Sequence, residues 1–143
     1  MGCVLHYYSD TDSFKDYAKT TRIPVYSVHD KNEKRGKRVI KEYRISFDVT
    51  DKDFDDFDGQ VKDVIKFLNE YKDDMIKFVN DYNINDNCLD FPFWSTLGDE
   101  MVGGKIVNQN KYLPKELVSI AGELNLCIGI SIYAKDAFDF IKN

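Results

Sequence analysis

Seven aspartates lie between residues 48 and 63, close enough together to bind a metal ion or a basic partner. They are Asp48, Asp51, Asp53, Asp55, Asp56, Asp58 and Asp63. A calcium-binding loop that started at Asp51 would need glycine at its sixth position and a bidentate glutamate at its twelfth. The chain has Asp56 and Lys62 at these positions. The spacing therefore does not fit this calcium motif, and the sequence predicts no metal site.

The same acids suit a protein partner of opposite charge. The chain carries 20 Lys and Arg against 25 Asp and Glu, so its net charge is −5. An acidic surface repels nucleic acid and steers basic proteins towards itself. An exposed aromatic side chain beside such a surface is a good anchor in an interface. The residues predicted to contact a basic protein partner are Asp53, Asp55, Asp56 and Trp94.

A basic stretch precedes the acids and offers an alternative function. Its members are Lys31, Lys34, Arg35, Lys37, Arg38, Lys41 and Arg44. A hairpin of this composition could bind a small anionic ligand, or nucleic acid through its phosphates. Acids interrupt the stretch at Asp30, Glu33 and Glu42. Such mixing is typical of a solvated hairpin face, so nucleic-acid binding is not the favoured prediction.

Residues that carry enzyme chemistry form no recognisable pattern. His6 and His29 both lie in the first third of the chain, and no serine lies in a nucleophile-elbow sequence. Gly103 and Gly104 are not followed by a phosphate-binding pattern and are typical of a hairpin turn. The sequence thus predicts a non-enzymatic binding protein without a cofactor. An enzyme with unrecognised chemistry is the remaining alternative.

The cysteines and the hydropathy pattern indicate the compartment. Cys3, Cys88 and Cys127 are widely spaced, which predicts neither a disulfide framework nor a zinc site. No apolar run approaches the roughly 18 residues of a membrane span. No signal-peptide core precedes a cleavage site. We therefore expect a cytoplasmic protein that does not cross a membrane.

The clearest secondary structure lies between residues 112 and 134. Pro114 suits the first turn of a helix. Apolar residues follow it at helical spacing, namely Leu117, Ile120, Ala121 and Leu124. Strict alternation over residues 126–134 predicts a half-buried strand. Upstream, the apolar spacing of residues 61–82 predicts one bent helix or two consecutive helices.

The order of the elements predicts the fold class. A first strand is expected at a sheet edge near the N-terminus, and Pro24 places the next strand at an edge too. From Tyr43 onward the order is strand, helix, strand, strand, helix, strand, with the third strand around Lys105 to Val107. This is the split βαβ, or ferredoxin-like, order of an α+β protein.

The domain organisation follows from this order. We expect one α+β domain over residues 1–143, in which residues 1–40 form an N-terminal extension and hairpin. The hairpin would extend the mainly antiparallel sheet of a βαββαβ core over residues 41–134. Whether the free edge strands pair in a homodimer stays open.

Residues 43–134 resemble a family of small uncharacterised bacterial α+β domains. The positions that carry the resemblance are Tyr112, Pro114, Glu116, Leu117, Ala121, Leu124, Ser131 and Tyr133. The family has no established activity, and some similar domains look like immunity proteins of bacterial toxin systems. The resemblance implies the fold more than any function. An immunity or inhibitor protein that neutralises a basic toxin or nuclease is the concrete form of the predicted binding module.

Overall fold

A mixed five-stranded sheet forms the centre of the α+β fold in the computed structural model, which describes residues 2–139. Its strands are β1 (Val4–Ser9), β2 (Val25–His29), β5 (Tyr43–Asp48), β6 (Asp86–Trp94) and β9 (Ile128–Tyr133). Their order across the sheet is β2-β5-β1-β6-β9. Neighbouring strands run antiparallel, except that β6 and β9 are parallel.

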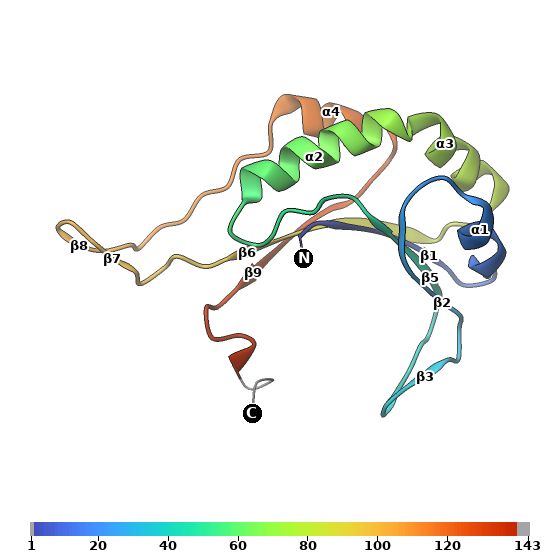
Figure 1. The fold of residues 1–143 in the computed structure, drawn as a ribbon, viewed down its shortest axis with the longest axis horizontal. Helices are drawn as coiled ribbons and strands as arrows, with labels where there is room; N and C mark the ends of the chain where they lie inside the picture. The colour runs from blue at the N-terminus through green and yellow to red at the C-terminus, as the bar shows by residue number, and fades with distance from the viewer. Residues whose placement is uncertain (1, 140–143) are drawn as a thin grey trace.

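The other elements are helices and two short hairpins. The helices are α1 (Lys15–Thr20), α2 (Phe57–Glu70), α3 (Lys72–Asp81) and α4 (Lys115–Glu123). The hairpins pair β3 (Lys34–Arg35) with β4 (Arg38–Val39), and β7 (Glu100–Met101) with β8 (Gly104–Lys105). Helices α2, α3 and α4 lie on one face of the sheet, while the β3 hairpin extends away from the other (Figure 1).

The core lies between the sheet and these helices. Alternation puts every second residue of the central strands on the helix side, where Leu5, Phe47 and Phe91 are fully buried. Helix α3 adds Phe78, whose ring lies 5.2 Å from Tyr7 and 4.4 Å from Tyr17 of α1, centroid to centroid. These contacts fasten the short helix α1 to the rest of the core.

Two helices, rather than one bent helix, cover the sheet between β5 and β6. Tyr71 closes α2 and precedes α3, and its N–H donates to the carbonyl of Phe67. Helix α2 begins at Phe57, where the Asp56 side chain caps it by accepting a hydrogen bond from Gly59 N at 2.9 Å. The sequence had left both alternatives open, and the structure resolves them.

The N-terminal strand lies in the middle of the sheet, so the expected edge position is wrong. Strand β1 pairs with β5 on one side and with β6 on the other. Which edges of a strand are paired depends on segments far along the chain. The residues of β1 therefore carry no local sign of their neighbours. Strand β2 does lie at an edge, as Pro24 indicated.

The ferredoxin-like order is not confirmed. The strand expected around Lys105 to Val107 forms only β8, which pairs with β7 in a separate two-stranded sheet. Strands β5 and β6 flank β1 and are joined by α2 and α3, while α4 connects β6 to the parallel β9. The sheet therefore contains a split βαβ unit and an adjacent one, but not the third core strand.

Candidate protein-binding surface

The acidic loop, residues 51–58, is held against the end of β6 by buried hydrogen bonds. The Gln60 side chain, fully buried in α2, donates to the carbonyl of Asp53 at 2.8 Å and to that of Pro92 at 3.0 Å. Trp94 N also donates to the Phe54 carbonyl at 3.4 Å. One amide side chain thus joins the loop, the helix that follows it and the strand.

An aromatic cluster lies directly beside this loop. Its members are Phe54, Trp94, Tyr133 and Phe138, from the loop, β6, β9 and the segment after β9. The Phe54 ring centroid lies 5.0 Å from that of Trp94 and 5.1 Å from that of Tyr133. Phe138 lies 5.7 Å from Trp94 and is exposed. Trp94 itself is half-buried. The structure therefore brings the predicted Trp94 next to the predicted acids.

The three predicted acids differ in what they do within the loop. All three are exposed. Asp53 Oδ1 accepts from Phe54 N at 2.8 Å, and Asp56 caps α2. Within residues 2–139, Asp55 makes no hydrogen bond or ion pair through its side chain. Asp53 and Asp56 therefore stabilise the loop conformation through hydrogen bonds in addition to their negative charge, whereas Asp55 contributes only its charge.

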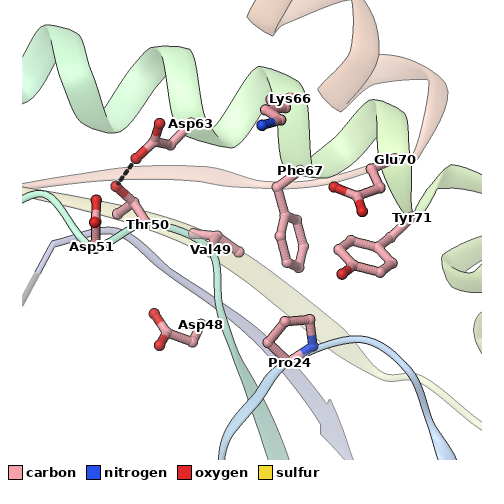
Figure 2. Close-up of a pocket in the computed structure, with 10 residues that line it drawn as sticks. All are labelled: Pro24, Asp48, Val49, Thr50, Asp51, Asp63, Lys66, Phe67, Glu70 and Tyr71. Atoms are coloured by element: carbon pink, nitrogen blue, oxygen red, sulfur yellow. Dashed lines mark hydrogen bonds between the residues drawn. The ribbon is translucent and has the colours of Figure 1, made fainter.

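A hollow of about 370 Å³ continues the acidic surface on the helix side of the sheet, between α2 and the end of β5 (Figure 2). The acids that line it are Asp48, Asp51, Asp63 and Glu70. Thr50 Oγ1 donates to Asp63 Oδ2 at 2.7 Å, the dashed line in Figure 2. A hydrogen bond and ion pair with Lys52 hold the pKa of Asp51 below its usual value. Lys66 is the cation in the lining.

Sequence reasoning missed Glu70 as a member of this hollow, although a signal was present. Asp63, Lys66, Phe67 and Glu70 recur at i, i+3, i+4 and i+7, which is one face of α2. This stripe adjoins the apolar stripe of α2 and shares the buried Phe67 with it, so its polar members lie at the margin of the core. What the helix could not show is that β5 ends opposite it.

The basic hairpin lies at the opposite end of β5 from the acidic loop. Lys15 Nζ pairs with Asp30 at 3.4 Å and with Glu33 at 2.9 Å. The pKa of Glu33 is lowered to about 2, first by the hydrogen bond from the Asp30 N–H and second by the contact with Lys15. Arg35 contacts the buried His29 ring, with 2.9 Å between the two nitrogens. These contacts hold the base of the hairpin to α1 and β2.

A concavity of about 180 Å³ at the base of this hairpin is lined by basic side chains. Arg38, Lys41 and Arg44 line it together with Tyr8 and Glu42. The Nε of Arg44 is buried and has no hydrogen-bond partner among the described atoms. A buried donor without a partner is costly, so this atom is a local weak point of the fold.

The helix-free face of the sheet carries a polar group that the sequence did not reveal. His6 Nδ1 lies 2.6 Å from Ser46 Oγ, across 40 residues of chain. Asp90 accepts from Ser131 at 2.7 Å. The pKa of His6 is lowered, mainly because the ring is partly buried and secondly because Arg44 carries a positive charge nearby. Ser46 is only 1% exposed. Its hydroxyl therefore cannot reach a substrate as this face stands, and the pair satisfies itself.

The Cys88 thiol is not activated, and the described acids form no metal site. The pKa of Cys88 is raised to about 11, mainly by burial and secondly by the neighbouring Cys127. Its thiol therefore stays protonated. Within residues 2–139, no three His, Cys, Asp or Glu side chains are placed to hold a metal ion. None of the described helices has the length and apolar character needed to cross a membrane.

Comparison with known proteins finds no match to a family model, a curated protein or a solved structure. The family resemblance of residues 43–134 therefore stays a prediction. The case for a function rests on the surfaces described above.

Proposed function

We propose that this protein is a non-enzymatic binding module that docks on a basic protein through the acidic loop and the aromatic cluster. An immunity or inhibitor protein that neutralises a basic toxin or nuclease would use such a surface. The cytoplasm is the compartment we infer for it.

The contact between Phe54 and Trp94 is the observation that carries this proposal. It joins two features that interfaces use together, an aromatic anchor and a rim of charge. The anchor is half-buried, so it is held in place by its neighbours before a partner arrives. A side chain ordered in advance loses less conformational entropy on binding. Asp53, Asp55 and Asp56 lie in the same loop as Phe54 and are exposed, so they add negative charge beside the anchor.

The distribution of charge also supports a basic partner. The acidic residues around the Figure 2 hollow extend the acidic surface from the loop along α2. Asp136 and Asp139 add two further exposed acids on the segment that bears Phe138. A surface of one sign raises the association rate with a partner of the other, and salt weakens that effect.

The test is affinity capture with the full chain from a lysate of the source cell, washed at low and then at high salt. We expect one basic protein, identified by mass spectrometry, to be retained at low salt and released at high salt. Trp94→Ala should weaken its binding at least tenfold, as loss of an interface anchor does.

Replacing Asp53, Asp55 and Asp56 with neutral residues distinguishes the effect of their charge on binding from their effect on the loop structure. The triple variant Asp53→Asn, Asp55→Asn and Asp56→Asn keeps an acceptor oxygen at each position, and asparagine caps a helix as well as aspartate does. It should fold normally and lose the partner. The matched control, Lys37→Glu with Arg38→Glu, should retain it. An empty capture at both salt concentrations would contradict the proposal, and so would a partner that only the control releases.

The concavity at the basic hairpin supports a second candidate, binding of a small anion or of nucleic acid. The three basic side chains that line it, Arg38, Lys41 and Arg44, are the specific observation that favours it. Titration with inorganic phosphate, followed by amide chemical shifts of β5, tests this candidate. Arg44→Gln should abolish any saturable shift, while the triple asparagine variant should leave it unchanged. Shifts that do not saturate would count against an anion site.

A further inference from the structure

Among residues 2–139, no strand pairs with the outer edge of β9. Strand β9 is the last in the sheet, and its register with β6 is regular over six residue pairs, from Leu89↔Ile128 to Trp94↔Tyr133. Residues 126–134 contain no charged residue and no proline. Natural edge strands are usually blunted by charge, proline or a bulge, because an open edge pairs with other chains.

The backbone groups of alternate β9 residues point away from β6. Leu89 N donates to the Cys127 carbonyl, and Ser95 N donates to the Tyr133 carbonyl. Odd-numbered residues of β9 therefore bond towards β6, since a parallel strand alternates with period two. The N–H and C=O groups of Ile130 and Ile132 consequently lie on the free edge, available to another strand.

The side chains of the same two residues are apolar and exposed. Ile130 is 44% exposed and Ile132 is 60% exposed. Their register partners in β6, Phe91 and Phe93, are buried in the core. The isoleucines thus lie on the core side of the sheet, where the helices do not cover them. An additional strand with its own helix layer would complete this cover.

We propose that β9 pairs antiparallel with β9 of a second copy of this chain, about a two-fold axis, to form a ten-stranded sheet. In this arrangement Ile130 and Ile132 of one copy pack beside the same residues of the other. A two-fold contact is self-complementary and closes, so it forms a dimer and not a filament. The inference is independent of the partner-binding surface proposed above.

Charge and topology favour a second copy over another occupant. Because residues 126–134 are uncharged, no like charges oppose each other when two β9 strands pair. A basic partner would find no carboxylate among them. Pairing also leaves only the two β2 edges free, and Pro24 together with the shifted register between Val25 and Ser27 guards each of these.

The area of the contact sets its strength. A strand of six residues is about 20 Å long, and sheet and helix layers lie roughly 10 Å apart, so the edge presents on the order of 200 Å² per copy. The total lies in the class of small interfaces, below about 1,200 Å², which form weak or transient complexes. We therefore expect dissociation in the micromolar range.

Sedimentation of the full chain over concentrations from about 1 to several hundred micromolar tests the proposal. The mass should rise with concentration from the monomer value of 16.7 kDa towards twice that value. Ile130→Lys should hold it at the monomer value, because a lysine on the edge blocks pairing. Tyr26→Lys is the matched control, since Tyr26 is 49% exposed on the β2 edge. It should leave the dimer intact.

Amide hydrogen exchange on the unmodified protein keeps the test valid if the lysine variant fails to fold. The amides of Ile130 and Ile132 should become protected as concentration rises, while those of Gly129 and Ser131 stay protected throughout. A monomer at every concentration would overturn the proposal. So would a dimer that Tyr26→Lys dissociates, or one in which the Ile130 and Ile132 amides stay unprotected. A chain that protects these amides only when another protein is added would assign the edge to that protein.

Discussion

At the β2 edge, Pro24 precedes the strand and the register with β5 shifts between Val25 and Ser27, whereas at the β9 edge six pairs follow one another without interruption. The cover differs as well. Helix α1 packs near β2 and brings Phe14 and Tyr17 onto Phe78. On the core side of β9, Ile130 and Ile132 stay exposed. Features of the chain itself blunt the β2 edge, whereas the described part of the chain leaves the β9 edge open to another strand.

This difference separates stability from recognition. Beside α1, the rings of Phe14, Tyr17 and Phe78 pack together next to the blunted β2 edge. The β9 edge and the aromatic cluster at its end instead carry exposed apolar side chains, namely Ile130, Ile132 and Phe138. Substitutions on the two sides should therefore affect different measurements.

The largest expected effect comes from the core beneath the protected edge. Phe78→Ala removes a ring in contact with Tyr7, Phe14 and Tyr17, and should lower the free energy of unfolding by about 3–5 kcal/mol. Ile132→Ala at the other edge should change it by less than about 0.5 kcal/mol. Urea denaturation of both variants measures the contrast. Equal losses would show that the β9 edge is as much a part of the core as α3.

A smaller effect separates two neighbouring acids of the acidic loop. Asp56→Ala removes the cap of α2 and should cost about 1 kcal/mol of unfolding free energy. Asp55→Ala removes a charge without a contact and should leave stability within about 0.5 kcal/mol. Asp55→Ala should nevertheless weaken capture of the basic partner. Thermal unfolding and capture, measured on the same samples, give both results. The interpretation fails if Asp55→Ala destabilises the chain as much as Asp56→Ala does.

The smallest effect is local and depends on pH. The Asp30 N–H and Lys15 hold the pKa of Glu33 near 2 at the base of the hairpin next to β2. Because this pKa is lowered, the contact stabilises the folded chain above the ordinary glutamate pKa and is lost as pH falls towards 2. Carboxyl chemical shifts in an NMR titration should show Glu33 protonating last among the glutamates. Glu33→Gln should remove the effect, and an ordinary midpoint for Glu33 would contradict it.

Local signals in the sequence were confirmed where a few neighbouring residues decide the outcome. The strand expected over residues 126–134 forms β9, and Pro24 does mark an edge. The helix expected over residues 61–82 forms as α2 and α3. The strand expected around Val107 failed, because Gly103 and Gly104 close a hairpin of only two pairs outside the main sheet.

The candidate site was predictable in its parts and not in its assembly. Composition indicated an acidic loop and an aromatic anchor, but Phe54 and Trp94 are 40 residues apart. Their contact depends on Gln60, whose side chain links the loop to Pro92. Nothing in the spacing of these residues predicts that bond. The pairing of His6 with Ser46 was hidden for the same reason, since it requires β1 to lie beside β5.

The sequence by itself determined the α+β class, the helical segments over residues 61–82 and 117–124, the uncharged strand at residues 126–134 and the acidic character of one loop. These properties depend on backbone preferences and on the polarity of neighbouring side chains, which are local. Only the tertiary structure decided that β1 is central, that Trp94 meets the acidic loop and that β9 is left with an open edge. Those facts depend on which distant strands pair. Backbone hydrogen bonds can form between any two strands, so the residues of one strand do not identify the strand that pairs with it.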